Sequence, residues 1–437
     1  MRGSISKFEL EVIFINLNQQ LIEDINKKAK EIEDKIIEYR RELHKNPELG
    51  LAESETSKFI KKELEDIGIP FKDNLYGRKE IKEELDKLGE KIQDRHESTG
   101  VVGILEGAKE GKTVLLRSDM DALKVKETKN EEHLPAKKDF RSKNEGIMHA
   151  CGHDSHMAML LGAAHILVDH KDQIKGKIKF LFQPDEERGC GAKLMKKGGV
   201  LEDTDAVFGI HVWSPIESGK VMINKGPMMA SVDNIWLDFK GGGGHSSAPD
   251  ETEEPLLAAS ELVNQLYKMN SRKVDTRNPS LVSIESFNSE ADWGVIPDQA
   301  KLKGTIRTFD EKVRETIIEE IKNIGNSLAN MHNLEFEFNN LYAFPPTTNT
   351  KNEAEIATEA AQEIFGDKVF EGKAVMSGED FAYYLQDRPG AFIFLGISNK
   401  EVGSDKPHHN PNFDVDESRL HQGSAMHSLI ALNYLNF

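Results

Sequence analysis

The chain has little cysteine, a deficit of basic residues and no long apolar run. Two cysteines, Cys151 and Cys190, occur among 437 residues, which excludes a disulfide framework and suits a reducing compartment. Lys and Arg number 57 against 75 Asp and Glu, a net charge of −18, and no stretch is basic enough to follow a phosphate backbone. No apolar run approaches the ~20 residues that span a bilayer. We therefore expect a cytoplasmic protein that partners neither nucleic acid nor membrane.

The chain is long for a single core, so two domains are expected. Its 38% hydrophobic and 30% charged residues fit an ordinary soluble protein. Residues 1–18 contain a short apolar patch, Val12–Ile15, broken by Glu9 and Glu11 and without a small-residue cleavage site. We expect a leader with no clear role there, and no signal peptide.

Apolar residues after the leader recur at steps of three and four, the period of an amphipathic helix. The stripe comprises Leu21, Ile25, Ala29, Ile32 and Ile36, and the helix should end near Asn46-Pro47. A second helix is predicted from Ser54 to Ile67. A further stripe of Ile81, Leu85, Leu88 and Ile92 predicts an inserted surface helix in the highly charged segment 78–97.

Short apolar runs follow these helices and alternate with helical patterns such as Met157–Val168. The runs are Val101–Leu105, Thr113–Arg117, Ile178–Phe182 and Ala206–Val212. This alternation predicts an α/β sheet covered by helices on both faces. Ligands of such sheets collect beyond the carboxyl ends of the strands, where Glu186, Glu187 and His211 would fall.

The pattern changes near Gly226, where a second set of elements begins. We predict strands at Asn234–Lys240, Leu281–Phe287, Lys301–Phe309 and Leu334–Phe338, with helices at Pro255–Met269 and Glu311–Ala329. The order βαββαβ is that of ferredoxin-like domains. We therefore expect a lid over residues 227–341, inserted into an α/β domain made of residues 19–226 and 342–437. The second part of that domain should contain a strand at Ala391–Leu395 and a final helix from Glu417.

Potential metal ligands occur at four separate places in the α/β domain. They are Cys151 and His153 in one motif, Glu186 and Glu187 after a strand, His211 at the end of another strand, and His408-His409 near the C-terminus. Extended backbone at 151–153 would point Cys151 and His153 to one side, and Gly152 would leave room for metals near the backbone. Thiolate, imidazole and carboxylate groups together form the ligand set of a closely spaced pair of divalent cations.

Such a pair would supply the chemistry of amide hydrolysis. Two cations ~3.5–4 Å apart would lower the pKa of a bound water and polarise a carbonyl oxygen. Glu187 could ligate, while Glu186 takes the proton from the water and later gives it to the leaving amine. The ligands suit Zn²⁺, Mn²⁺ or Co²⁺, and the thiolate favours Zn²⁺.

Each of these residues also has an ordinary structural interpretation. Cys151 could be a small buried hydrophobe, His153 a core residue, and the Glu pair part of a solvated face. Their joint occurrence at strand ends favours the metal site, whereas Cys190 is expected to be structural.

Asp119, Asp121 and His245 each allow two interpretations. The aspartates could orient histidine ligands or simply form a turn. His245 follows the glycine run Gly241–Gly244. That loop could carry His245 to a distant site, where it would stabilise an oxyanion, or it could be a plain hairpin loop.

Arg307 and Gly378 are candidates for binding the substrate. Arg307 could hold a carboxylate bidentately, although a lone arginine on a lid strand is commonly a surface ion pair. Gly378 lies in Ser377–Asp380, which precedes a helical pattern. A helix N-terminus there would favour an anion, but capping explains the same residues.

The motifs together resemble the co-catalytic metallopeptidase family of aminoacylase and carboxypeptidase G, in its amidohydrolase branch of hippurate and auxin-conjugate hydrolases. The resemblance covers roughly residues 36–437 and rests on Arg40–Gly50, Leu116–Leu123, Met148–His156, Phe182–Glu187, His211, Gly243–Pro249, Gly304–Thr308, Ser377–Phe381 and His408–Asp416. It implies two divalent metal ions held by Cys151, His153, Glu187, His211 and His409, with Glu186 as general acid/base. It also implies a lid that forms a homodimer, and a His245 that contacts the substrate carbonyl, often across the dimer.

Two features resemble p-aminobenzoyl-glutamate hydrolase subunits: the segment 78–97 and the ending Ala431–Phe437. They imply an aromatic acyl group on glutamate and leave open a related second subunit. Three positions depart from the family, which often has His at Asp250, Asn at Gly294 and Ala at Asp185. We hypothesise that Asp185 raises the pKa of Glu186 by like-charge repulsion.

The expected function is hydrolysis of an N-acyl amino acid, such as p-aminobenzoyl-glutamate or a hippurate-like substrate, to a carboxylic acid and a free amino acid. One alternative is a dipeptidase or carboxypeptidase of the same family. Another is a cysteine hydrolase with Cys151 as nucleophile and His153 as base, which would survive EDTA. A third is a catalytically silent binding protein that keeps the fold.

Overall fold

The computed structural model describes residues 19–436, so the predicted leader lies outside the described residues. The N-terminal stripe forms two helices, α1 (Gln19–Glu31) and α2 (Glu33–Lys45), which meet at Ile32. The break is slight, because the amide of Ile32 still donates to the carbonyl of Lys28 at 3.1 Å. Helix α3 (Ser54–Ile67) has the predicted limits and ends at Gly68, whose φ is 83°.

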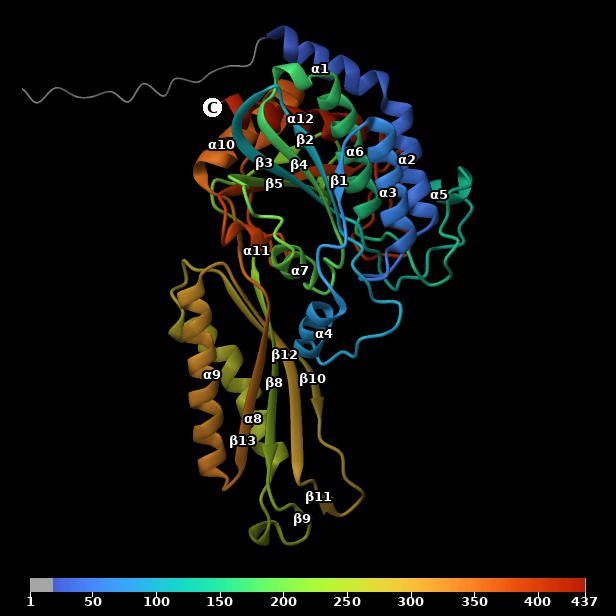
Figure 1. Cartoon of the computed structure of the whole chain (residues 1–437). Coiled ribbons are helices and arrows are strands. Elements are labelled where there is room, and N and C mark those ends of the chain that lie inside the picture. The colour runs from blue at the N-terminus through green and yellow to red at the C-terminus, as the bar shows by residue number, and fades with distance from the viewer. Residues whose placement is uncertain (1–18, 437) are drawn as a thin grey trace, which may run out of the picture.

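An eight-stranded mixed sheet forms the centre of the larger body (Figure 1), in the order β1-β2-β4-β3-β5-β16-β6-β15. Its strands are β1 (Phe71–Lys72), β2 (Val101–Glu106), β3 (Lys109–Asp119), β4 (Lys175–Gln183), β5 (Ala206–Glu217), β6 (Val221–Met222), β15 (Val369–Phe370) and β16 (Gly390–Ser398). All the strands predicted outside the lid are present in it. The central strands β4, β3, β5 and β16 run parallel, so their carboxyl ends meet at one edge.

Helices cover both faces of this sheet, as the alternating pattern predicts. On one face α1, α2 and α3 pack with α6 (His153–Asp169), α10 (Lys351–Phe365) and α12 (Leu420–Asn436). The other face holds α4 (Arg78–Lys87), α7 (Gly191–Lys197) and α11 (Ala382–Leu385). Each face of the sheet therefore has its own hydrophobic core. Leu116 of β3 packs in the core under α1, α2 and α3, and its neighbour Leu115 packs in the core under α4 and α7, because successive side chains of a strand point to opposite faces.

The remaining elements of the larger body are short. They are α5 (Leu134–Lys137), β7 (Pro227–Met229) paired with β14 (Thr347–Thr348), and 3-10 turns at Lys171–Gln173, Gly366–Lys368 and Glu417–Arg419. The last of these turns leads into α12, so the final helix begins as predicted. None of the described helices is both long and apolar enough to cross a membrane.

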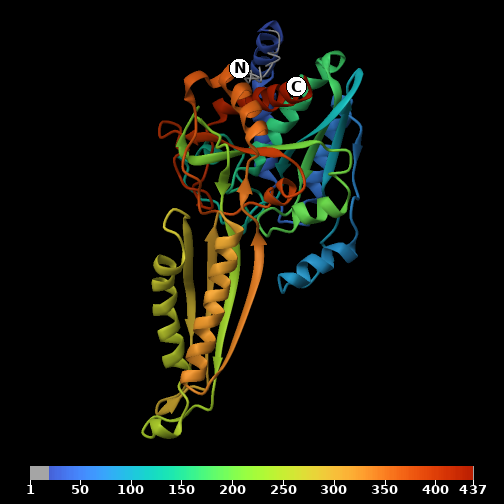
Figure 2. The same cartoon turned by 90° about the vertical axis from the view of Figure 1, so that its left-hand side faces the viewer.

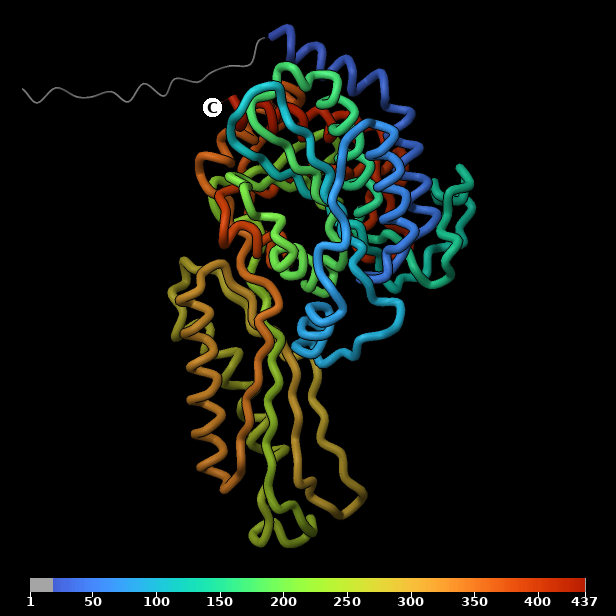
Figure 3. Tube along the Cα trace, in the orientation of Figure 1, coloured from blue at the N-terminus to red at the C-terminus, as the bar shows by residue number. Residues whose placement is uncertain are grey.

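The inserted segment 78–97 is helical only in its first half, which corrects the prediction of one surface helix. Helix α4 is 10 residues long, and its apolar side is buried through Ile81 and Leu85. The chain then continues without regular structure to β2 (Figure 3). The guanidinium of Arg78 holds this second half by donating to the carbonyls of His96 at 2.8 Å and Gln93 at 3.2 Å.

A four-stranded antiparallel sheet with two helices on one face projects from the larger body (Figures 1 and 2). Its elements are β8 (Ser231–Lys240), α8 (Pro255–Lys273), β10 (Ser280–Asn288), β12 (Gln299–Thr308), α9 (Glu311–Met331) and β13 (Glu335–Phe344). Alternate β8 residues Ile235, Leu237 and Phe239 are buried with the helices in a core of their own. The strand order β10-β12-β8-β13 and the βαββαβ chain order agree with the ferredoxin-like unit. We call this unit the lid.

Strands β9 (Gly244–His245) and β11 (Val295–Ile296) pair with each other at the end of the lid that lies away from the larger body (Figure 1). The 3-10 turn Pro249–Glu251 follows β9. This end of the lid therefore carries His245 on a two-stranded ribbon.

Candidate metal centre

The predicted ligands gather at the carboxyl end of the sheet, where the larger body meets the lid. A cavity of about 470 Å³ there is lined by Cys151, Glu186, Glu187, His211 and His409 from the body, and by residues of the lid that include Arg307. His153 is wholly buried behind this surface. The predicted residues thus gather at the carboxyl ends of the strands, where the strand-end rule expects a ligand site.

Cys151 and His153 approach each other by a different backbone route from the one predicted. Gly152 has a φ of 94° and caps α6, whose first residue is His153, so the backbone is a left-handed turn and not an extended strand. A Cβ on residue 152 would lie 2.4 Å from Cγ2 of Val212. Glycine is thus required by its φ and by the close approach of Val212.

The five predicted ligands form one contiguous cluster. Cys151 Sγ lies 3.7 Å from His211 Nε2, and Glu187 Oε1 lies 3.9 Å from His153 Nε2 and 3.5 Å from His409 Nε2. Ligand atoms of Cys151, His153 and Glu187 all lie within 4.8 Å of one another. Within the described chain, His153 Nε2 and Glu187 Oε1 are buried without a hydrogen-bond partner. Buried atoms of this kind need a partner, and divalent cations fit this donor set.

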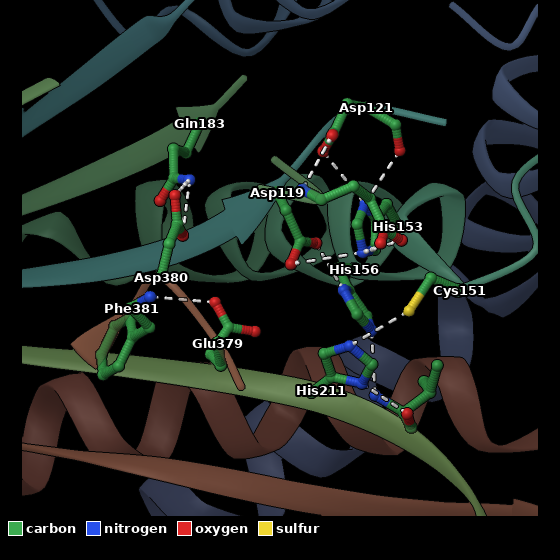
Figure 4. A network of polar contacts seen from close by, with 12 residues as sticks. Asp119, Asp121, Cys151, His153, His156, Gln183, His211, Glu379, Asp380 and Phe381 are labelled. Atoms are coloured by element: carbon green, nitrogen blue, oxygen red, sulfur yellow. Dashed lines mark hydrogen bonds and ion pairs between the residues drawn. The ribbon is translucent and has the colours of Figure 1, made fainter. Parts of the chain in front are cut away.

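Asp119 and Asp121 lie against the histidines, as expected of residues that orient ligands. His153 Nδ1 lies 2.8 Å from the carbonyl oxygen of Asp121, and Asp119 Oδ1 lies 2.6 Å from His156 Nδ1 (Figure 4). Burial alone would raise the pKa of Asp119, but Arg117, His153 and His156 hold it well below its usual value. Asp119 is therefore an anion at neutral pH.

His156 was missed by the sequence analysis. Its ring, with those of His153 and His211 and the carboxylate of Asp119, forms a second group of possible ligand atoms within 4.8 Å. Its Nε2 accepts from the amide of Val212 at 2.9 Å. The signal was the spacing of three from His153, which puts both residues on one face of a helix.

His408 and His409 point to different surroundings. His409 has a φ of 63° and a half-exposed side chain that reaches Glu187. His408 is partly buried, and its Nε2 accepts from the amide of Ser214 at 3.1 Å. Burial, with the neighbouring histidines, lowers the pKa of His408 to about 3. Of the two, His409 is the one that completes the cluster at Glu187.

Glu186 lies beside a buried group of acids that the sequence did not reveal. Carboxylate oxygens of Glu186, Glu379 and Asp380 lie within 4.8 Å of one another. Arg117 is the cation of this group and donates to Glu379 and to Asp380 at 2.9 Å each. Burial, followed by the charges of Glu379 and Glu187, raises the pKa of Glu186 well above its usual value.

The segment Ser377–Asp380 precedes a helix but is not its N-terminus, which corrects that prediction. Helix α11 begins only at Ala382 and has 4 residues. Gly378 nonetheless lines the cavity, and a Cβ there would lie 2.6 Å from Cγ2 of Val232. Its contribution is therefore close packing against the lid strand β8.

The hypothesis that Asp185 raises the pKa of Glu186 gains no support from the structure. The acids with the largest effect on that pKa are Glu379, Glu187, Asp380 and Asp121. The carboxylate of Asp185 instead pairs with Arg188, since its Oδ1 lies 2.6 Å from Nε of that residue. The backbone φ of Asp185 is 53°, which the order of residues alone does not show.

Arg307 lines the cavity from β12, with its side chain half-buried. Its Nη1 donates to the carbonyl of Met376 at 2.7 Å, and it makes no ion pair with another residue between 19 and 436. The alternative of a surface ion pair is therefore wrong. The guanidinium keeps donors free for a carboxylate.

His245 is not part of this cavity within one chain. It is exposed on β9, where it pairs with Val295 of β11 at the far end of the lid (Figure 1). Its exposed side chain and its ribbon suit contact with another molecule, but the structure does not bring it to Glu186.

Cys190 is buried at the start of α7, in agreement with a structural role. The pKa of Cys151 is raised well above its usual value by burial and by Glu187 and Glu186. A thiol with a raised pKa is a poor nucleophile, which argues against the cysteine hydrolase.

Comparison with known proteins places the chain in a family. The sequence signature described as Peptidase family M20/M25/M40 matches residues 115–433, and the chain belongs to this family. Its members are hydrolases of amide bonds, which confirms the predicted class of enzyme and the family resemblance.

Similar proteins cover nearly the whole chain. Thermostable carboxypeptidase 2 of Saccharolobus solfataricus is 39% identical over 95% of this chain and 99% of its own. IAA-amino acid hydrolase ILR1-like 4 of Arabidopsis thaliana is 35% identical over 92% of this chain and 86% of its own. The crystal structure of the Bacillus subtilis protein YXEP, described as a dinuclear metal binding peptidase, superposes with a TM-score of 0.77 at 31% identity, over 93% of this chain and 99% of that one.

Proposed function

We propose that this protein hydrolyses N-acyl amino acids, with an aromatic acyl group favoured, to a carboxylic acid and a free amino acid. The observation that carries the proposal is one cavity in which Cys151, Glu187, His211 and His409 adjoin both Glu186 and Arg307. This cavity combines a set of potential metal ligands with the buried carboxylate of Glu186, which can carry a proton. It also contains Arg307, a cation that can bind the free carboxylate of an amino acid.

The residues fit two divalent cations, Zn²⁺ or Mn²⁺, with Co²⁺ as a further possibility. Cys151, His153, Glu187, His211 and His409 would hold them, with Asp119 and Asp121 orienting His153 and His156. When bound, the cations supply Lewis acidity toward the amide carbonyl and toward water. Support comes from the orphaned ligand atoms His153 Nε2 and Glu187 Oε1, and from YXEP, which is described as dinuclear.

Glu186 would move the proton in this reaction. It takes a proton from the attacking water, whose oxygen bonds to the carbonyl carbon, and gives it to the nitrogen as the C–N bond breaks. Its raised pKa, caused first by burial and then by Glu379 and Glu187, makes it able to hold the proton between the two steps. Arg307 would bind the carboxylate of the amino acid and orient the amide.

His245 would act in the site of a second subunit. Because it lies at the far end of its own lid, a partner is needed to bring it near Glu186. We propose a homodimer formed through the lid, or a pair with a related subunit, in which His245 donates to the developing oxyanion.

A second candidate is a carboxypeptidase or dipeptidase, favoured by the 39% identity to Thermostable carboxypeptidase 2. The same cavity would then take a peptide whose terminal carboxylate lies at Arg307. The two candidates differ in what stands on the acyl side of the bond, and not in the residues that break it.

Release of free amino acid from a small panel tests the proposal. The panel holds p-aminobenzoyl-glutamate, hippurate, acetyl-methionine, an indoleacetyl-amino acid and a dipeptide, each with Mn²⁺, with Zn²⁺ and with EDTA. Metal-dependent cleavage of an acyl amino acid is the expected result. Cleavage of the dipeptide alone would favour the peptidase, and no cleavage of any substrate would favour the catalytically silent binding protein.

A further inference from the structure

The cation proposed to bind the substrate carboxylate has an apolar surface directly beside it on the lid. Arg307 of β12 lies opposite Val232 of β8, and Val232 lies opposite Phe344 of β13. Residues paired in this way have Cβ atoms about 4.5–5.5 Å apart. All three residues line the cavity at the metal centre. A ligand held by Arg307 in this cavity therefore lies close to Val232 and Phe344.

The three side chains share the face of the lid sheet that α8 and α9 do not cover. Ile306, the neighbour of Arg307, is buried in the lid core with Ile235 of β8, and successive side chains of a strand point to opposite faces. Val232 is three residues from Ile235, an odd step, and therefore faces the cavity with Arg307. Phe344 joins them because the register of β13 on β8 shifts just before it, and a bulge of this kind re-aims a side chain.

A loop of the larger body holds the cation and the apolar pair together. The carbonyl of Met376 in this loop accepts from Nη1 of Arg307 at 2.7 Å. A Cβ on Gly378 would lie 2.6 Å from Cγ2 of Val232 and 2.8 Å from Cδ2 of Phe344. The loop thus lies against all three lid residues, and the spacing between the guanidinium and the apolar pair is fixed by the fold.

The structure of an amino acid makes this arrangement selective. Its carboxylate and its side chain leave the same α-carbon, so the side chain must lie near the groups that adjoin Arg307. An apolar side chain gains free energy on leaving water beside Val232 and Phe344, whereas a charged one loses its hydration there. Among the residues that the structure describes, Arg307 is the one Lys or Arg that lines the cavity. Once it binds the α-carboxylate, a side-chain carboxylate has no second cation of this kind.

We propose that Val232 and Phe344 form the subsite for the amino-acid side chain, and that the enzyme releases amino acids with apolar side chains in preference to glutamate. The inference rests on the proposed hydrolysis of N-acyl amino acids and on Arg307 as the residue that binds the α-carboxylate. It departs from the resemblance to p-aminobenzoyl-glutamate hydrolase subunits on the amino-acid side of the bond, and it makes no demand on the acyl group.

The test compares three ligands that differ only in the amino-acid side chain: N-benzoyl-glycine, N-benzoyl-methionine and N-benzoyl-glutamate. The side chains of methionine and glutamate are similar in length, so polarity is the main difference between those two ligands. Binding is measured by titration calorimetry on metal-loaded full-length protein carrying Glu186→Gln, so that the ligands are not consumed. We expect the methionine ligand to bind about 10- to 100-fold more tightly than the glutamate ligand, because its side chain is buried in the subsite.

Adding Phe344→Ala should weaken the methionine ligand about 5-fold more than the glycine ligand, because glycine has no side chain that could lose a contact. Phe344→Leu keeps an apolar side chain and should retain most of the preference for methionine over glutamate. The matched control is Phe370→Ala, which removes an exposed ring of β15 that does not line the cavity. This control should leave the preference unchanged.

Equal or tighter binding of the glutamate ligand in the parent protein would overturn the inference. The same holds for an equal loss of all three ligands in Phe344→Ala, or for a loss of preference in Phe370→Ala. Binding of all three ligands without a preference would leave the proposed function standing, whereas no binding of any ligand would contradict that function too. Hydrolysis in the substrate panel is a separate result, because binding is measured without turnover.

Discussion

At the scale of single residues, neighbours decide what each carboxylate can do. Glu186 and Glu187 are adjacent in sequence, but Glu187 faces His153 and His409, while Glu186 faces Glu379 and Asp380. Glu187 is thereby placed to bind a cation. Glu186 is placed among acids, where burial and repulsion raise its pKa.

Replacing Glu186 by Gln should separate binding from turnover. We expect hydrolysis to fall by about 10²–10⁴-fold, because a general acid/base is lost, with metal content unchanged. Activity and metal content of the same preparation are the measurements. The control is Asp185→Asn, a nearly isosteric change in the neighbouring acid, which should retain most activity and the same acid limb of the pH–rate profile.

Several residues of the site could be predicted from the sequence. The others could not, because their partners are far away in the chain. The five predicted ligands and Glu186 stand at strand ends or in short motifs, so the local sequence pattern was enough to propose them. The buried partners of Glu186 could not be found this way, because Arg117 reaches Glu379 across 262 positions of sequence. The left-handed backbone at Gly152 and at Asp185 depends on φ values that residue order does not fix.

At the scale of elements, one buried arginine joins two segments that carry predicted ligands. Arg40 on α2 lies 3.0 Å from Asp154, 2.6 Å from Asp414 and 3.0 Å from Glu417. Asp154 follows His153 directly, and Asp414 is five residues beyond His409. The guanidinium thus joins the segments that carry two of the predicted ligands.

Arg40→Lys should weaken metal binding, because a single ammonium cannot reach all three carboxylates. We expect a 10- to 100-fold loss of metal affinity, as is usual when residues that support ligands are changed. Competition with a chromogenic chelator measures it. Arg41→Lys, which changes a more exposed arginine that pairs with Glu417 only, is the control, and an equal loss there would contradict the assignment.

His44, on the same helix, predicts a pH dependence of stability. Burial would lower the pKa of its imidazole, but hydrogen bonds to Asp154 and Glu127 raise it to about 9. Because this lies above the ordinary 6.5, protonated His44 stabilises the fold fully below pH 6.5, and the contribution is lost as the pH rises through 9. The contribution is about 3 kcal/mol at most.

Thermal unfolding of the parent and of His44→Asn between pH 6 and 10 measures this effect. The parent should be more stable at pH 6, and the gap between the two proteins should narrow toward pH 10. A gap that stays constant across the range would show that the charge of His44 does not stabilise the fold.

Helices and strands could be predicted wherever a periodic apolar pattern was followed by a residue that ends such an element. The limits of α3 were predicted correctly, and Gly68 ends this helix. The long strands of both sheets were predicted from their apolar runs, but the two-residue strands β1, β6 and β15 were missed. The inserted segment was predicted as one long helix because Leu88 and Ile92 continue the spacing. Its chain leaves the helix after Lys87, since Arg78 takes up backbone carbonyls of the second half.

At the scale of the whole molecule, the lid carries His245, the predicted catalytic residue that lies far from the cavity. His245 lies at the far end of the lid, whereas Arg307 on the same lid lines the cavity. If a partner supplies His245, two variants that are each inactive, His245→Ala and Glu186→Gln, should complement one another.

Co-expression of the two variants should restore about a quarter of the parental activity, since half of randomly formed dimers have one intact site. The assay uses a substrate identified by the panel, with each variant alone as control. No recovery in mixed dimers that are shown to form would place His245 outside the reaction or in its own subunit.

The central claim is that Cys151, His153, Glu187, His211 and His409 hold a pair of cations on which hydrolysis depends. The most direct measurement is metal content by mass spectrometry, followed together with hydrolysis as Zn²⁺ or Mn²⁺ is returned to chelator-treated protein. The account predicts two cations per chain, activity that rises with loading, and loss of tight binding in His409→Ala. Full hydrolysis by the metal-free protein, or unchanged metal binding in His409→Ala and Cys151→Ala, would contradict it.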